Sequence, residues 1–317
     1  MTRLLDSTPP DWLFQRSIVE WTINDRLRTQ LPYLYQLFSH YTQLFFKVSP
    51  SSPTLRGGKY VLQLLNRLNA VSGNRYVEID TGTYEVIVDI TDPRFLKVVS
   101  ELSFPDETQF LSELLDEGDT FVDVGANQGT YSIVASHLVG EHGTVLAFEP
   151  QASLSEAVRR SLEKAPANYE VFTMALGDRD GEVDIHVPSS YSGRAGIIEA
   201  YSGKRTHDTK QVPIRRADTV LESRESKGNW VVKVDVEGAE LAFLRGAQTF
   251  LSSVTPSLII EMNPHSMRDA NITEDKFIKE IRGLGFNFFQ HTKRGEAKKD
   301  IEKLDLSGDK KKDLILN

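Results

Sequence analysis

Cysteine is absent from the 317 residues, which excludes disulfides, thiolate zinc sites and cysteine nucleophiles. The absence fits a reducing compartment. No run of about 18 or more apolar residues occurs, so the sequence predicts no transmembrane helix. The first residues, MTRLLDSTPPDW, lack the apolar core of a secretory signal. We therefore expect a cytoplasmic protein.

A basic surface is also lacking, because the formal net charge is −8. Binding to a phosphate backbone needs clustered positive charge, so a nucleic-acid partner is not expected. The hydrophobic fraction of 39% and the charged fraction of 26% are those of a globular protein that can bury a full core. The length predicts one large domain or two modest ones.

The N-terminal third differs from the rest of the chain. Apolar residues recur at helical spacing over residues 11–72, and residues 76–90 read as a β-hairpin. A helix containing Phe110 and Leu114 is expected next. We expect residues 1–95 to form a helical and hairpin cap or an oligomerisation region; a membrane-surface or partner helix is the alternative. The main domain would then span residues 96–317.

From residue 119 onward, predicted strands and helices alternate, which is typical of an α/β domain with a parallel sheet. Ser153 and Glu156 form a candidate capping box for the helix after the second strand. The polar stretch 188–210 is expected to be irregular, as binding loops and lids often are. Strands are predicted at 120–124, 144–149, 170–175, 230–235, 257–262, 286–290 and 313–316.

A glycine-containing turn follows the first of these strands. The segment VDVGANQGTYS runs from an apolar strand through Gly125, Ala126, Asn127 and Gly129 into a helix. Glycine permits the tight turn and lets a ligand approach bare backbone, and the helix N-terminus adds N–H donors. The turn is therefore a candidate nucleotide site, although such a turn can be purely structural.

An acidic residue follows the next strand at the spacing of a ribose-binding carboxylate. Glu149 lies twenty residues after Gly129, at the end of the strand predicted at 144–149. A carboxylate there can accept hydrogen bonds from both ribose hydroxyls of an adenosine. We therefore predict that Glu149 binds ribose, with helix capping as the alternative.

The chemistry of the turn favours S-adenosylmethionine over NAD. A pyrophosphate-binding turn requires glycine where this chain has Asn127. S-adenosylmethionine has no pyrophosphate and carries an amino-acid group instead. Asp123 is a suitable partner for its ammonium, and the backbone of Gly125–Gly129 for its carboxylate.

The string KVDVEGAE at 233–240 places ionisable residues at the end of a central strand. If that strand extends through residue 237, Lys233, Asp235 and Glu237 share one face. Burying these groups is costly unless they are paired or functional. The structural alternative is a buried ion pair between Lys233 and Asp235, with Glu237 capping the next helix.

The next strand ends in IIEMNP, which adds Glu261, with His265 just beyond. An acceptor hydroxyl loses its proton during methyl transfer, and a positioned Asp, Glu or His can take that proton. We therefore expect catalytic residues among Asp235, Glu237, Glu261 and His265, with Lys233 beside them. The same four side chains could instead hold a hard divalent cation, although their spacing is not diagnostic of a metal, and we predict none.

Taken together, these motifs resemble the FkbM-family methyltransferases. The matching pieces occur in the family's order over about residues 100–262: VDVGANQGTYS, AFEP, ALGD, ADTVL, KVDVEGAE, the Gly246–Ala247 pair and IIEMNP. The resemblance implies a class I methyltransferase fold with S-adenosylmethionine as donor. That fold is Rossmann-like, with a mostly parallel seven-stranded sheet and helices on both faces. By the same resemblance, Ala175, Leu176 and Asp178 would line the adenine.

The resulting hypothesis is an S-adenosylmethionine-dependent O-methyltransferase that acts on a hydroxyl of a sugar, glycan or other natural product. An NAD-dependent Rossmann oxidoreductase and a non-catalytic module that binds adenosine compounds are the alternatives. A small-molecule or glycan acceptor is the expected partner, with self-association through the N-terminal region as a further expectation.

Overall fold

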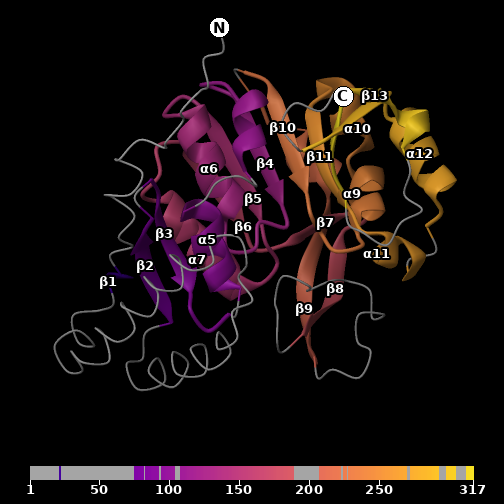
Figure 1. Ribbon diagram of the computed structural model, residues 1–317. Coiled ribbons are helices and arrows are strands. Elements are labelled where there is room, and N and C mark those ends of the chain that lie inside the picture. Colours follow the sequence, from indigo (N-terminus) through magenta and orange to yellow (C-terminus); the bar gives the residue numbers. More distant parts are fainter. Residues whose placement is uncertain are drawn as a thin grey trace, which may run out of the picture.

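A central sheet organises the molecule (Figure 1). The computed structural model describes residues 21–22, 75–81, 83–92, 94–103, 108–188, 207–222, 224–226, 228–269, 272–292, 298–304 and 312–317. Within this part of the chain, eight strands form the sheet, in the order β13-β12-β14-β11-β10-β4-β5-β6. They are β4 (Thr120–Val124), β5 (Thr144–Phe148), β6 (Asn168–Phe172), β10 (Trp230–Val234), β11 (Ser257–Met262), β12 (Phe288–His291), β13 (Lys299–Asp300) and β14 (Lys312–Leu316).

The sheet is mostly parallel, as predicted. Strands β6, β5, β4, β10 and β11 pair in parallel, and β14 inserts antiparallel between β11 and β12. The class I methyltransferase fold is thus confirmed, and the two-residue β13 extends the seven expected strands at one edge. Strand order reverses between β4 and β10, and ligands bind beside such a switch point in open α/β sheets.

Helices cover both faces of the sheet because each face presents apolar side chains. One core cluster packs α6 (Thr130–Val139) and α7 (Ala152–Leu162) against the sheet. The other core cluster packs a second set of helices against the opposite face of the sheet. Its helices are α8 (Ala217–Leu221), α9 (Glu240–Gly246), α10 (Gln248–Val254), α11 (Pro264–Asp269) and α12 (Glu274–Gly283). Strands β4 and β10 are buried along their whole length, which explains their apolar sequences.

The predicted capping box at the start of α7 is wrong. Gln151 occupies the N-cap position, and no side chain caps the helix there. Glu156 instead pairs with Arg159 and Arg160 one turn further along. Side chains three and four residues apart are neighbours on a helix, so the Glu156 carboxylate pairs with these arginines and not with the helix N-terminus.

The predicted N-terminal hairpin is confirmed as β2 (Tyr76–Asp80) and β3 (Glu85–Asp89). Its apolar face joins the core cluster of α6 and α7 together with α5 (Phe95–Ser103) and η2 (Gln109–Glu113), the 3-10 helix formed where a longer helix was expected. Ser161 of α7 accepts from the Ile87 amide at 2.8 Å. The hairpin therefore shares its core with the main domain; the boundary expected at residue 95 stays a prediction.

Most of the helical region expected over residues 11–72 lies outside the described residues. The exception is Trp21–Thr22, which forms β1 and pairs with β2, so the helical prediction is wrong at those two positions.

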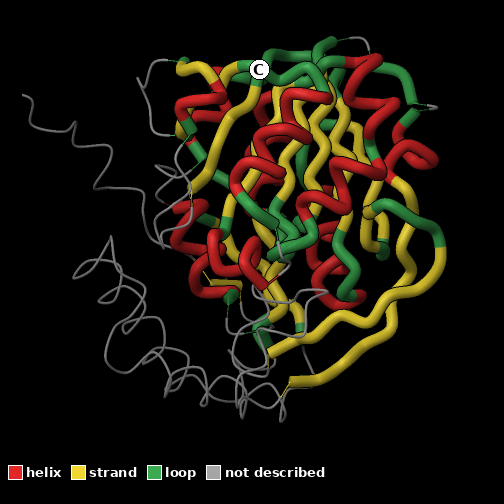
Figure 2. Tube along the Cα trace, turned by 90° about the vertical axis from the view of Figure 1, so that its right-hand side faces the viewer, coloured by secondary structure: helices red, strands yellow, loops and turns green. Residues whose placement is uncertain are grey.

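A second hairpin extends below the central sheet (Figures 1 and 2). It comprises β8 (Gly181–Pro188) and β9 (His207–Arg216), and the short β7 (Ala175–Gly177) pairs with β9. The stretch predicted to be irregular, 188–210, therefore overlaps both strands: residues 207–210 pair with 185–188. Residues 189–206 lie outside the described part.

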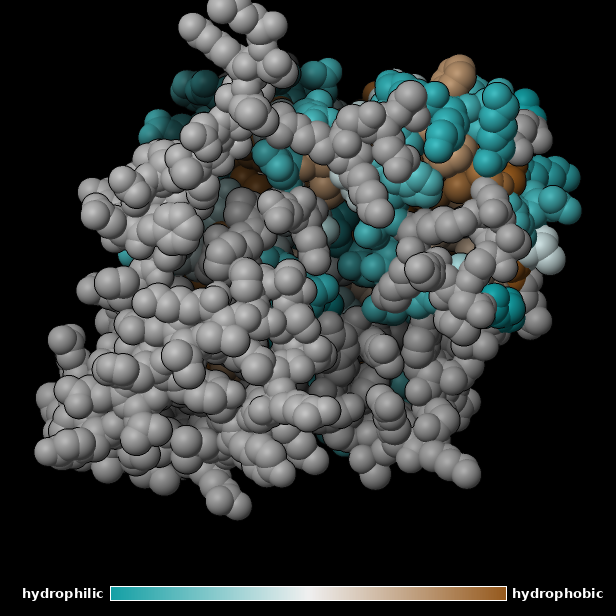
Figure 3. Space-filling model, in the orientation of Figure 1, coloured by the Kyte–Doolittle hydropathy of each residue, from teal (hydrophilic) through white to brown (hydrophobic). Residues whose placement is uncertain are grey.

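Hydrophilic side chains dominate the described surface around α12 in Figure 3. Among the described residues, Phe288 is the exposed large apolar side chain. A short 3-10 helix, η5 (Ile301–Lys303), packs beside α12. No helix among the described residues is both long and apolar enough to span a bilayer.

Candidate functional site

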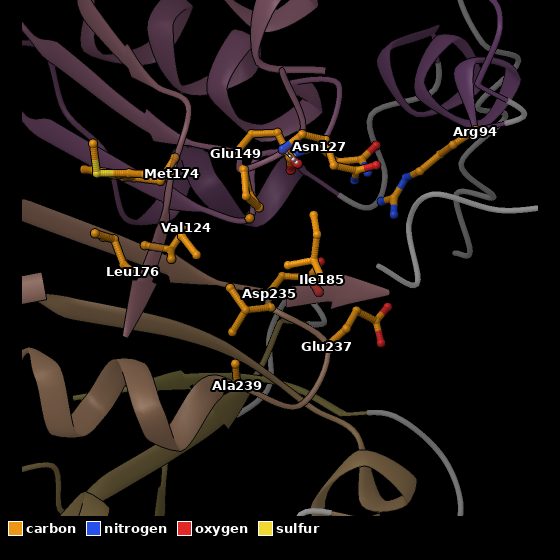
Figure 4. Close-up of a pocket in the computed structure, with 16 residues that line it drawn as sticks. Arg94, Val124, Asn127, Glu149, Met174, Leu176, Ile185, Asp235, Glu237 and Ala239 are labelled. Carbon is orange, nitrogen blue, oxygen red and sulfur yellow. Dashed lines mark hydrogen bonds between the residues drawn. The ribbon is translucent and has the colours of Figure 1, made fainter. Parts of the chain in front are cut away.

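A cleft opens at the carboxyl ends of β4, β5 and β10, beside the switch point of the sheet (Figure 4). It contains about 670 Å³ of empty space, part of it open to solvent. Its lining residues are Arg94, Val124, Gly125, Asn127, Phe148, Glu149, Pro150, Gln151, Met174, Ala175, Leu176, Ile185, Asp235, Val236, Glu237 and Ala239.

Gly125 forms the floor of the cleft, where the turn after β4 meets the turn after β10. Its φ is +86°, and a Cβ added here would lie 2.0 Å from the Asp235 carbonyl oxygen. Any side chain would therefore both strain the backbone and separate the two turns. The close approach of the Asp235 carbonyl thus explains why this position requires glycine. Across the same junction, Asp235 N donates to Val124 O at 3.0 Å.

The backbone amides of the glycine turn are largely used within the protein. Those of Gly125 and Ala126 both donate to Phe148 O, and that of Gly129 donates to Ala126 O. The Asn127 amide donates to Glu149 Oε2 at 2.9 Å. The bonds from Gly125, Ala126 and Asn127 hold the turn against the end of β5, and the Gly129 bond closes the turn on itself. These four amides are therefore not spare donors for the ligand carboxylate that the sequence had assigned to the turn backbone.

Glu149 lies in the centre of the cleft and is 4% exposed. Its second oxygen accepts from Gln151 N at 2.9 Å, so backbone donors hold both oxygens in place. Burial raises the pKa of Glu149 to about 7, although the two amide hydrogen bonds oppose the rise. Each oxygen retains acceptor capacity toward a ligand.

An apolar slot lies on one side of Glu149. Phe148, Met174, Ala175, Leu176 and Ile185 line it, and Phe148 stacks on Phe172 with 4.7 Å between ring centroids. Ala175 and Leu176 thus lie where the resemblance implied. Asp178 is not among the lining residues; its backbone oxygen accepts from Arg216 Nη1 at 3.0 Å, which directs this end of the segment toward β9.

Behind the cleft lies a buried charge cluster on β4 and β10. Lys233 Nζ is 3.4 Å from Asp235 Oδ2, 3.7 Å from Asp123 Oδ1 and 4.5 Å from the centroid of the Tyr131 ring. Nearby carboxylates raise the pKa of Lys233 despite its burial. The buried ion pair that we considered as the structural alternative is thus present.

Asp123 belongs to this cluster rather than to the cleft lining. It is 0% exposed, and its Oδ2 accepts from Ser132 Oγ at 2.7 Å. Burial raises the pKa of Asp123, and Lys233 opposes the rise. Asp123 therefore anchors Lys233, and Lys233 in turn contacts Asp235 at the cleft wall.

The three acidic candidates come together, and the His265 side chain lies outside the described part of the structure. Oxygen atoms of Asp235, Glu237 and Glu261 lie within 4.8 Å of one another, which is close enough to hold one cation between them. Glu261 extends from β11, and His265 lies in the first turn of α11. The structure thus brings carboxylates from two strand ends together at one place.

Glu237 reaches this cluster by a route that differs from the prediction. Strand β10 ends at Val234, so no strand alternation carries the side chain to 237. Glu237 has a left-handed backbone with φ of +47°, which is strained for a glutamate and is a feature often found at functional sites. It does not occupy the N-cap position of α9, which is Ala239.

Two residues that the sequence reasoning did not single out contribute to the site. Glu240 is buried, and its carboxylate accepts from Gly238 N at 3.0 Å, which shapes the turn carrying Glu237. Burial raises the pKa of Glu240 to about 7. Its position in KVDVEGAE was a usable signal. Arg94 lines the cleft from the turn before α5, and no motif marks it.

The geometry agrees with the comparison to known proteins. The profile of the methyltransferase FkbM domain matches residues 123–288, which include the glycine turn, Glu149 and the acidic cluster. The chain belongs to the FkbM methyltransferase family. This membership favours methyl transfer over the NAD-dependent oxidoreductase that the glycine turn had left open.

The chain is similar to a curated relative, the hexuronic acid methyltransferase AglP of Haloferax volcanii. The two are 30% identical over 158 residues, which are 50% of this chain and 62% of the relative. A solved methyltransferase FkbM of Methylobacillus flagellatus is similar with a TM-score of 0.39 and 15% identity, covering 71% of this chain and 54% of that one. A TehB-like methyltransferase of Corynebacterium glutamicum has a TM-score of 0.36 and 11% identity, covering 82% and 96%.

Membership of the FkbM methyltransferase family implies S-adenosylmethionine as the methyl donor, and the cleft residues fit this molecule. The apolar slot suits adenine, and the buried Glu149 carboxylate suits a ribose diol. Asn127 lines the cleft beyond Glu149, and its buried Oδ1 has no hydrogen-bond partner among the described residues. Such an orphaned acceptor is costly unless a ligand donor, such as an ammonium group, satisfies it.

Proposed function

We propose that this methyltransferase transfers a methyl group from S-adenosylmethionine to an oxygen atom of a sugar, glycan or other natural product. The observation that carries the proposal is the group of three carboxylates, Asp235, Glu237 and Glu261, at the acidic end of the cofactor cleft. This group provides carboxylates that can take up a proton at the place where the molecule to be methylated would enter.

In this proposal, different residues of the cleft bind different parts of the cofactor. Glu149 accepts hydrogen bonds from the ribose, and Ala175 and Leu176 line the adenine. The turn of Gly125, Ala126 and Gly129 brings backbone close to the ligand, and Asn127 accepts from the ammonium group. Asp123 acts indirectly through Lys233, and Asp178 supports the end of the adenine-lining segment from outside the cleft.

S-adenosylmethionine supplies an electrophilic methyl group on a sulfonium sulfur. As the acceptor oxygen forms its bond to carbon and the carbon–sulfur bond breaks, a hydroxyl acceptor must release its proton. Asp235 and Glu237 line the cleft and take up that proton in our proposal, and Glu261 completes the acidic group. Like charges at short range favour proton uptake by one of them.

Lys233 acts as a positioning residue in this scheme. Its ammonium lies 3.4 Å from Asp235 and offsets part of the clustered negative charge. His265 is the second residue of α11, which follows the same strand end, and in our proposal it assists the proton transfer. Holding oxygen, methyl and sulfur in line accounts for much of the remaining rate in such displacements.

A sugar-like acceptor is supported by the curated relative, whose name states that it acts on hexuronic acid. Because that similarity covers half of this chain, we propose the acceptor class and not the individual sugar. The first experiment is a transfer assay with radiolabelled S-adenosylmethionine over a panel of neutral sugars and uronic acids, with NAD⁺ reduction and NADH oxidation as the control activities.

Variants then test the carboxylates. Asp235→Asn and Glu237→Gln should each lower the transfer rate about 100-fold or more, as loss of a general base does. Asp184→Asn and Glu182→Gln are matched controls because both residues are exposed on β8, and they should retain full activity. Full activity of Asp235→Asn and Glu237→Gln in well-folded protein would refute the assignment.

A further inference from the structure

The charged residues around the cleft are unevenly distributed. Among the described residues that line it, Arg94 is the only arginine, lysine or histidine, whereas Glu149, Asp235 and Glu237 are acidic. Figure 4 shows the Arg94 side chain extending from the turn before α5 toward the end of the cleft that holds Asn127 and Glu237. This end lies opposite the apolar slot of Met174 and Leu176.

Helix stability does not explain an arginine at this position. Arg94 directly precedes α5, and a positive charge at a helix N-terminus opposes the helix dipole. Its backbone is nevertheless fixed, because the Arg94 amide donates to Asp92 Oδ1 at 2.8 Å and the neighbouring Phe95 is 0% exposed. The turn thus holds a cation at the cleft at some cost to the helix.

The ligand proposed for the cleft carries charges of both signs in its amino-acid part. The acidic wall suits the sulfonium and the ammonium, but its carboxylate needs a positive partner or free N–H donors. Four of the five amides of the turn, those of Gly125, Ala126, Asn127 and Gly129, donate within the protein, which leaves the turn few free donors. Lys233 is 6% exposed, lies behind the cleft and is engaged by Asp123 and Asp235.

We infer that Arg94 binds a ligand carboxylate at the acidic end of this cleft. Its planar guanidinium can donate two parallel hydrogen bonds to such a group. The carboxylate comes either from the amino-acid part of S-adenosylmethionine or from an acidic acceptor such as a uronic acid. The inference rests on the proposed function, because it takes the cleft as the cofactor site.

Its consequence concerns the N-terminal region. Arg94 lies outside the family match, which begins at residue 123, and within the region that the sequence assigned to a cap. The hairpin and α5 share a core with α6 and α7, so their packing fixes where the guanidinium lies. The N-terminal region thereby contributes directly to ligand binding.

Calorimetric titration of the full chain tests the inference and separates the two sources. The nucleosides are S-adenosylhomocysteine, which has the amino-acid carboxylate, and methylthioadenosine, which lacks it. A second titration adds glucuronate or glucose to protein saturated with S-adenosylhomocysteine. Arg94→Met removes the charge at similar length, Arg94→Lys keeps the charge without the fork, and Arg245→Met removes an arginine paired with Glu280 on the surface.

If the cofactor supplies the carboxylate, Arg94→Met weakens S-adenosylhomocysteine binding about 10- to 100-fold and leaves methylthioadenosine binding unchanged. Arg94→Lys should recover part of that loss. If the acceptor supplies it, both nucleosides bind normally, and Arg94→Met weakens glucuronate binding relative to glucose. Arg245→Met should match the wild type throughout.

Two results would contradict the inference in different ways. If the wild type binds S-adenosylhomocysteine and Arg94→Met changes the binding of neither nucleoside nor of glucuronate, Arg94 binds no carboxylate and the proposed function stands. If the well-folded wild type binds neither nucleoside, the cleft is not the cofactor site, and the inference is refuted together with that part of the proposed function.

Discussion

Cofactor binding should depend on pH through Glu149. Its carboxylate is buried and has a pKa of about 7, while its hydrogen bonds to ribose hydroxyls require the ionised form. A proton therefore competes with the ligand, and binding weakens as pH falls through that pKa. If the protonated form does not bind, the dissociation constant of S-adenosylhomocysteine at pH 5.5 is about 30-fold higher than at pH 8.

Glu149→Gln should remove this dependence. The amide oxygen can replace only one carboxylate oxygen, so its NH₂ group must face the N–H of either Asn127 or Gln151. Losing that hydrogen bond should cost about 1–3 kcal/mol of unfolding free energy, and binding at pH 8 should weaken about 10- to 100-fold. Below pH 7, the affinities of the variant and the wild type should converge.

Calorimetric titration across pH 5.5–8.5 measures the effect, with circular dichroism confirming the fold at each pH. Glu240→Gln is the necessary control, because Glu240 also has a pKa raised to about 7 and lies near the cleft. That variant should retain the pH dependence of binding. A wild-type affinity that is equal at pH 6 and pH 8 would refute the reasoning.

Three further predictions concern stability and metal use. Gly125→Ala should lower the unfolding free energy by about 2–5 kcal/mol in denaturant titrations, because it adds a steric clash to the backbone strain. Gly118→Ala, with φ of +91° and nothing within 4 Å of an added Cβ, should cost only the strain, about 1–2 kcal/mol; equal losses would contradict the contact with Asp235. Between about pH 4.5 and 7, Glu240 is protonated in the folded protein and ionised in the unfolded chain. Its contribution to the free energy of unfolding therefore falls as pH rises through this range, by up to about 3 kcal/mol. Glu240→Gln should therefore flatten the thermal stability profile from pH 5 to pH 8, and an unchanged slope would count against this account. Dialysis against EDTA should leave methyl transfer unchanged if the acidic cluster accepts a proton, whereas loss of activity that Mg²⁺ restores would assign the cluster to a cation.

The main elements of the fold were predictable from local patterns. Buried parallel strands have continuous apolar runs, and β4 and β10 carry such runs because both of their faces are covered by helices. The glycine turn and Glu149 were recognisable for a similar reason, since a fixed spacing along the chain places them at adjacent strand ends. The predicted capping box is wrong because the pattern of Ser153 and Glu156 takes no account of the nearby arginines, which bind the Glu156 carboxylate.

The sequence by itself thus determined the alternation of strands and helices, the family and the identity of the strand-end residues. These depend on interactions between residues close in the chain or on motifs with fixed spacing. The tertiary structure decided which groups face the ligand: it placed Asp123 behind the cleft with Lys233, and it turned Glu237 into the cleft through a left-handed residue. It also brought Arg94 from the N-terminal region to the end of the cleft. Such placements depend on packing between segments distant in the chain, which no local pattern encodes.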